Sequence, residues 1–87
     1  MTFDDLKFEE RSDLFGGIRA RVTFPNGFGA SVIKGDNSYG GRDGLYELAV
    51  MGKDGNLTYE TPITSDVEGR LTETAVSELL ARIEKLK

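Results

Sequence analysis

The sequence predicts an α+β domain in which a small antiparallel sheet is covered on one face by a single C-terminal helix. Three observations support this fold class. Apolar and polar residues alternate in two pairs of segments. A turn containing glycine separates the members of each pair. A helical stripe of apolar residues ends the chain. We therefore expect two hairpins, or about four strands, within one domain spanning residues 1–87.

The first predicted hairpin joins IRARVTF (residues 18–24) to FGASVIK (residues 28–34) through PNG. A two-residue Asn-Gly turn would place Pro25 in a hydrogen-bonded rung, where it has no N–H to donate. A three-residue loop avoids this problem, because only Gly27 then takes the left-handed conformation. The resulting register pairs Phe24 with Phe28, Val22 with Ala30 and Ala20 with Val32.

The second predicted hairpin joins LYELAVM (residues 45–51) to LTYETPI (residues 57–63) around a turn centred on Asp54 and Gly55. This turn pairs Val50 with Tyr59, Leu48 with Thr61 and Tyr46 with Ile63. The segment SDVEG, which contains Asp66 and Glu68, is interpreted as a linker to the helix.

The C-terminal helix has Thr72 as its expected N-cap, with Glu73 near the positive end of the helix dipole. Its apolar stripe consists of Val76, Leu79, Leu80, Ile83 and Leu86. Residues 1–17 are ambiguous and weakly ordered on this interpretation, because the spacing of Phe3, Leu6 and Phe8 allows either a helix or a strand.

The composition restricts the chemistry that we expect. The chain has 87 residues without cysteine or histidine, so it lacks thiolate ligands, the commonest metal ligand and the usual general base near neutral pH. Its serines therefore have no histidine to activate them, and its loop carboxylates do not match a calcium-loop spacing. We expect a protein that is not an enzyme, with no catalytic residues, no metal and no cofactor.

The charge pattern bears on partners and location. The net charge is −4, although residues 14–34 contain Arg19, Arg21 and Lys34 and no acid. Overall acidity argues against binding to a nucleic-acid backbone. The sequence has no apolar run long enough to span a bilayer and no basic-then-apolar signal at its start. We therefore expect no membrane association and a cytoplasmic location.

The glycine-rich segment GDNSYGGRDG, residues 35–44, is the first candidate site. A phosphate-binding loop normally opens a helix, whereas this segment links two predicted strands. It is either a connection in which glycine supplies positive φ, a backbone anion site assisted by Arg42, or a protein-binding loop with an exposed Tyr39. The expected partner contacts are Asn37, Ser38, Tyr39 and Arg42.

The outer face of the predicted sheet, opposite the helix, is the second candidate. Alternation places Arg19, Arg21, Ile33, Glu47, Ala49, Met51 and Glu60 there, all of them exposed. Either the charges pair across strands, or the face binds a protein through Arg19 and Arg21 with Ile33 and Met51 as apolar anchors.

The segments FPNGFGASVI, SYGG, GLYELAVM and TPITSDVEGRLT occur in this order between residues 18 and 86. In them the chain resembles small uncharacterised proteins encoded by tailed bacteriophages and prophages. The resemblance implies a bacterial cytoplasm during infection, where small acidic proteins bind host or defence proteins. It assigns no functional residues.

Together these observations predict an interaction protein, phage- or prophage-encoded, that binds and modulates a bacterial host or defence protein. Two alternatives remain open. One is a binder of small molecules or nucleotides that uses loop 35–44, and the other is a structural virion component. A homodimer is also allowed.

Overall fold

The computed structural model describes residues 1–11, 17–35, 40–58 and 68–86. Its elements, in chain order, are the 3-10 helix η1 (Phe3–Asp5), strands β1 (Glu9–Arg11), β2 (Gly17–Thr23) and β3 (Gly29–Lys34), the 3-10 helix η3 (Gly41–Asp43), strands β4 (Tyr46–Met51) and β5 (Glu68–Leu71), and helix α1 (Glu73–Glu84). The strands form one sheet in the order β1-β2-β3-β4-β5, with every neighbouring pair antiparallel.

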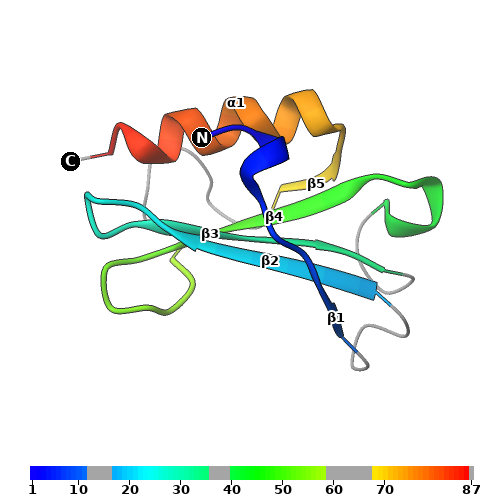
Figure 1. Ribbon diagram of the computed structural model, residues 1–87, viewed down its shortest axis with the longest axis horizontal. Helices are drawn as coiled ribbons and strands as arrows, with labels where there is room; N and C mark the ends of the chain where they lie inside the picture. The colour runs from blue at the N-terminus through cyan, green and yellow to red at the C-terminus, as the bar shows by residue number, and fades with distance from the viewer. Residues whose placement is uncertain (12–16, 36–39, 59–67, 87) are drawn as a thin grey trace.

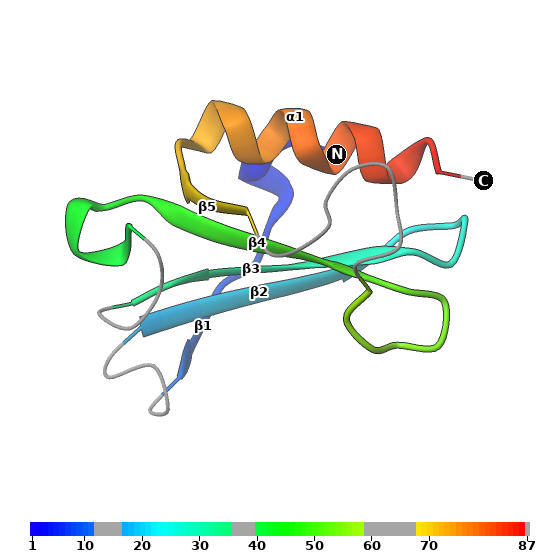
Figure 2. The ribbon, with the colours of Figure 1, turned by 180° about the vertical axis from the view of Figure 1, so that it is seen from behind.

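Helix α1 lies on one face of this sheet, and the loop that follows β4 lies on the other side (Figures 1 and 2). The α+β class and the C-terminal helix are therefore confirmed. The expectation of about four strands is corrected, because the described chain contains five. The additional strands are β1, from the N-terminal segment whose spacing allows either a helix or a strand, and β5, whose sequence shows no strand-like alternation.

The core lies between the sheet and α1. From the helix, Val76, Leu80 and Ile83 are fully buried, as the apolar stripe predicts. The sheet contributes the inward-facing residues Ala20, Phe24, Ala30, Val32, Tyr46, Leu48 and Val50. Thr72 is confirmed as the N-cap, because its Oγ1 accepts a hydrogen bond of 3.1 Å from the backbone N–H of Ala75.

The first hairpin has the predicted register, with Val22 opposite Ala30 and Ala20 opposite Val32. Its loop is the three-residue type, because Gly27 has a φ of 90° and its N–H donates to the carbonyl of Phe24. In this loop Pro25 does not occupy a hydrogen-bonded pair of the hairpin, where its missing N–H would leave a bond unmade. The loop type predicted from the sequence is therefore confirmed.

The turn after β4 repeats this geometry and corrects the predicted register of the second hairpin. Gly55 has a φ of 82° and donates to the carbonyl of Gly52, while Gly52 donates to the carbonyl of Asn56. Met51 therefore lies opposite Leu57, one residue away from the predicted register. The two-residue turn would require a positive φ at both Asp54 and Gly55, whereas the three-residue loop requires it at Gly55 alone.

The partner of the first half of β4 is a second correction to the predicted hairpin. Tyr46 pairs with Leu71 and Leu48 pairs with Glu68, so β5 lies where Thr61 and Ile63 were expected. Glu68 thus belongs to a strand and not to a linker, while Tyr59, Glu60, Thr61, Ile63 and Asp66 lie outside the described residues.

The N-terminal segment is neither a single helix nor a single strand. Its 3-10 helix lies against α1, where the backbone N–H of Phe3 donates to Ser77 Oγ at 2.8 Å. Strand β1 then pairs with β2, placing Glu9 opposite Arg19. The rings of Phe3 and Phe8 contact Tyr46, with centroid distances of 4.9 and 5.7 Å. Of the ambiguous segment, residues 1–11 thus complete one end of the core.

Candidate interaction site

The outer face of the sheet, opposite α1, is formed by alternate residues of β2, β3 and β4. Arg21 is exposed there, while Arg19 and Ile33 are half-buried and lie opposite each other. Met51 and Ala49 were expected to be exposed, but their exposed fractions are only 8% and 7%. This is a correction. Met51 is covered because the chain reverses beneath it and brings Leu57 opposite, and Ala49 lies on a strand with a neighbour on each side.

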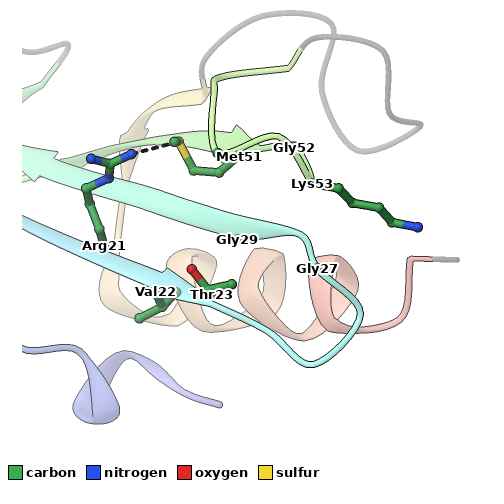
Figure 3. A pocket seen from close by; sticks show the side chains of 9 residues that line it. Arg21, Val22, Thr23, Gly27, Gly29, Met51, Gly52 and Lys53 are labelled. Carbon is green, nitrogen blue, oxygen red and sulfur yellow. Dashed lines mark hydrogen bonds between the residues drawn. The ribbon is translucent and has the colours of Figure 1, made fainter.

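A hollow of 160 Å³ opens at the end of this face, between the β2–β3 hairpin and the turn after β4 (Figure 3). Its lining consists of Arg21, Val22, Thr23, Gly27, Gly29, Met51, Gly52, Lys53 and Gly55. Four of these residues are glycines, so the floor is mostly backbone. At Gly29 a Cβ atom would lie 2.2 Å from the carbonyl oxygen of Val22, so the close approach of β2 and β3 requires glycine there.

A second hollow of 270 Å³ adjoins the first and shares Arg21, Met51 and Gly55 with it. Its remaining lining residues are Arg19, Ser31, Asn56 and Leu57. Leu57 is one of the two large apolar side chains that stand out as exposed in the described chain, with an exposed fraction of 48%. The two hollows therefore place apolar and cationic groups side by side.

Arg21 and Met51 divide the two hollows. The guanidinium Nη2 of Arg21 donates to Met51 Sδ at 4.0 Å, reaching across β3 (Figure 3). A thioether is a weak acceptor, and a guanidinium has five N–H donors. Within the described part of the chain, neither Arg19 nor Arg21 has an ion-pair partner. Among the described residues, the acceptor found for Arg21 is Met51 Sδ, so its other N–H donors can bind an external acceptor.

Lys53 forms the rim of the first hollow. Its Cγ lies 3.0 Å from the position of a Cβ on Gly27, so the aliphatic stem crosses the hairpin at this glycine. Its ammonium group lies 5.3 Å from the centroid of the Phe28 ring, within the range of a cation–π contact. Arg21 thus lies on one side of the hollow and the stem of Lys53 on the other, with the Lys53 ammonium group over the Phe28 ring.

The glycine-rich segment is a separate place in the molecule. Asn37, Ser38 and Tyr39 lie outside the described residues. Arg42 lies in η3 with an exposed side chain, between Gly40 and Gly44, which both have left-handed backbone conformations. Since η3 precedes β4 and Met51 ends that strand, Arg42 lies at the other end of β4 from Met51.

The sequence interpretation missed the contribution of residues 52–57 to the outer face. The signal was present, since Gly27 and Gly29 in FPNGFG and Gly52 and Gly55 in GKDGN recur at the ends of neighbouring strands. It could not be used without the knowledge that both turns meet at the same end of the sheet. The one-residue register error also hid the position of Leu57.

The turn after β4 contains a carboxylate with a shifted pKa. Among the residues that the structure describes, the carboxylate with a resolved shift is Asp54, whose pKa is lowered chiefly by the backbone N–H of Asn56. This is a contact within the turn itself. The described residues include no group of three or more potential metal ligands of the His, Cys, Asp and Glu types. No helix among them has the length and apolar character needed to cross a bilayer.

Comparisons with protein-family models, with curated proteins and with solved structures gave no match to the chain. The function must therefore be inferred from the arrangement of its own residues.

Proposed function

We propose that the protein is a non-enzymatic interaction module that binds another protein through the outer face of its sheet. One observation carries the proposal. The face that α1 leaves uncovered has two adjoining hollows, in which Arg21, Met51 and the exposed Leu57 come together. Arginine and methionine are enriched at protein-binding surfaces, and their best-packed contacts lie in small recesses.

The size of the hollows favours a protein partner over a small molecule. Their volumes are 160 and 270 Å³, whereas pockets that enclose a drug-sized ligand usually measure about 300–1,000 Å³. A recess of this size accommodates individual side chains of a larger partner. The phage-like sequence pattern supports a bacterial host or defence protein as that partner, in the cytoplasm.

The experiment is affinity capture from bacterial lysate, quantified by mass spectrometry, with a matched set of variants. Arg21→Glu and Leu57→Ser alter the outer face, whereas Arg82→Glu alters an exposed position of α1 on the opposite side of the domain. We expect at least one protein to be captured by the wild type and by Arg82→Glu, and lost with both outer-face variants. Far-UV circular dichroism at the capture temperature verifies that each variant is folded.

An Arg42→Ala variant distinguishes the outer face from the glycine-rich segment, because Arg42 lies at the other end of β4. Loss of the captured protein with Arg42→Ala and its retention with Arg21→Glu would move the proposed site to residues 35–44. If no captured protein distinguishes any variant from the wild type, the proposal is wrong.

A further inference from the structure

We infer that the outer face recognises an acidic peptide segment that carries an apolar side chain between carboxylates. This inference rests on the proposed function and adds the chemistry of the partner. The apolar side chain enters the hollow between the two glycine turns, and the carboxylates meet Arg21 and Lys53 at its two sides.

The hollow has the size of one side chain. Its volume is 160 Å³, and a cavity of about 150 Å³ is enough to bind benzene. The Met51 side chain supplies an apolar wall, and methionine adapts to differently shaped apolar groups. The glycines leave the floor without side chains, so an entering group contacts backbone directly.

The charged side chains that line the hollow have one sign, although the Asp54 carboxylate lies in the adjoining turn, where it accepts a hydrogen bond of 3.1 Å from the backbone N–H of Asn56. Arg21 and Lys53 line the hollow, and the described lining contains no carboxylate. In a protein with a net charge of −4, this is a local reversal that attracts an acidic segment and not a basic one. A guanidinium also matches a carboxylate in bidentate geometry.

Arg19 has a different environment from Arg21. It lies opposite Glu9 of β1 on one side and opposite Ile33 on the other, and Ile33 is in turn opposite Glu47. Arg21 faces Ser31 in the same ladder, beyond the end of β1. The acidic neighbours reduce the positive potential at Arg19, so we assign the main contact to Arg21 and a smaller one to Arg19.

Nucleic acid fits this surface less well than a peptide. Single-stranded nucleic acids are held by aromatic side chains on which bases stack, along a basic groove. The described residues that line the two hollows include no aromatic side chain, and the cations among them are Arg19, Arg21 and Lys53. A nucleotide ligand would also need more enclosure than either hollow offers.

The test is an NMR titration of the ¹⁵N-labelled protein with three synthetic peptides. The first is acetyl-GGEGLGEGG-amide, the second replaces both Glu residues by Gln, and the third replaces Leu by Ala. We expect the first peptide to shift the backbone amides of residues 21–23, 27–29 and 51–55. Its affinity should exceed that of the Gln peptide about tenfold, because each hydrogen bond then gains a charged acceptor.

Matched variants assign the contacts. Arg21→Gln should reduce the affinity for the acidic peptide about tenfold, Arg19→Gln should reduce it less, and Arg82→Gln on α1 should leave it unchanged. Raising the salt concentration should lower the affinity for the acidic peptide and leave the affinity for the Gln peptide nearly unchanged. The Ala peptide should bind more weakly than the Leu peptide at every salt concentration, because it leaves the hollow unfilled.

Equal binding of the acidic and Gln peptides would overturn the inference, as would shifts confined to other surfaces or the absence of binding by all three peptides. If a dT₁₀ oligonucleotide binds more tightly than the peptides and shifts the same amides, the ligand of this face is a nucleic acid and not an acidic peptide. These results leave the proposed function intact if capture from lysate still depends on Arg21 and Leu57. Failure of that capture removes the proposed function itself.

Discussion

At the scale of single residues, Asn26 connects the first hairpin to the end of the helix. Its side-chain Nδ2 donates to the carbonyls of Ile83 and Leu86, both at 2.9 Å, and to that of Glu84 at 3.2 Å. Its Oδ1 accepts from the backbone N–H of Phe28 at 3.0 Å. The last carbonyls of a helix lack their regular partner within the helix, although that of Ile83 also accepts from the backbone N–H of Leu86 at 3.1 Å. Asn26 supplies a partner from a strand turn 57 residues away from Ile83 in the sequence.

We predict that Asn26→Ala lowers the free energy of unfolding by about 1–3 kcal/mol, because partly buried carbonyls lose their donor. Asn26→Asp should be at least as destabilising, since a carboxylate accepts from Phe28 but cannot donate to the helix. Urea unfolding at neutral pH measures both changes. Asn56→Ala is the matched control, because its side chain contacts Asp54 within its own exposed turn. A loss for Asn26→Ala no larger than for this control would contradict the role of Asn26.

Arg70 has a strained backbone. Among the described residues other than glycine, Arg70 is the one that has a positive φ, of 55°. It lies in β5, whose pairing with β4 shifts register between Tyr46 and Leu48. Its side chain forms an ion pair of 3.0 Å with Asp43, but both groups are about two-thirds exposed, at 68% and 65%. Such an exposed pair contributes little.

We predict that Arg70→Gly is more stable than Arg70→Ala by about 1 kcal/mol, although glycine normally weakens a strand. Both variants lose the ion pair, so the difference isolates the left-handed backbone. Thermal unfolding of the two proteins under identical conditions measures it. If the alanine variant is the more stable one, the strain at this position is negligible.

At the scale of elements, local patterns could be predicted and long-range pairings could not. The first hairpin followed from the sequence because Pro25 and Gly27 restrict the loop to one type and alternation then sets the faces. The helix followed from its stripe and from Thr72. Strand β5, with the sequence EGRL, has no alternation, and it forms because it pairs with a strand 20–25 residues earlier in the chain.

The candidate site could be predicted only in part, for the same reason. Arg19, Arg21 and Ile33 were placed on the correct face by alternation in β2 and β3. The covering of Met51 depends on the turn type at residues 52–56, where Asp54-Gly55 resembles a two-residue turn. The hollow itself requires two turns, distant in sequence, to meet at one end of the sheet.

The turn after β4 provides a prediction that depends on pH. The backbone N–H of Asn56 donates to Asp54 Oδ1 at 3.1 Å, and the Asn56 side chain adds a longer contact. Both favour the ionised carboxylate, so the pKa of Asp54 lies below its ordinary value of 3.8. The stabilisation of the turn is therefore complete at neutral pH, and it is lost as the pH falls through the lowered pKa of the folded state.

We expect an NMR titration of the Asp54 carboxyl carbon to have its midpoint below 3.8. Asn56→Ala should retain most of the shift, because the backbone N–H is the larger cause and survives the substitution. A return of the midpoint to 3.8 in that variant would show instead that the Asn56 side chain dominates.

At the scale of the whole molecule, folding and binding use opposite faces of one sheet. The inner face is closed by α1 and by the N-terminal segment, whereas the described residues that lie against the outer face are those of the turn after β4 (Figures 1 and 2). The edge strand β1 has three residues, two of them glutamates, and charged short edges discourage pairing with another chain. This separation explains why outer-face substitutions can test binding without removing core contacts.

The N-terminal segment belongs to the folding side, which yields the last prediction. The Phe3 ring lies 4.9 Å from the Tyr46 ring and 5.6 Å from the Phe8 ring, measured between centroids. Phe3→Ala removes these contacts but keeps the backbone N–H that donates to Ser77. We expect the free energy of unfolding to fall by about 2 kcal/mol and Tm to fall by about 10 °C.

The same experiment tests whether the segment folds together with the domain. Far-UV circular dichroism follows the helix and sheet, while near-UV circular dichroism follows the tyrosines, since the chain contains no tryptophan. The two unfolding curves should coincide in both wild type and Phe3→Ala, because a cooperative domain unfolds in one transition. Phe3→Leu should recover about half of the loss by restoring apolar contact without the ring geometry. An earlier near-UV transition with an unchanged far-UV curve would mean that the segment unfolds separately, and that the sheet and α1 are stable without it.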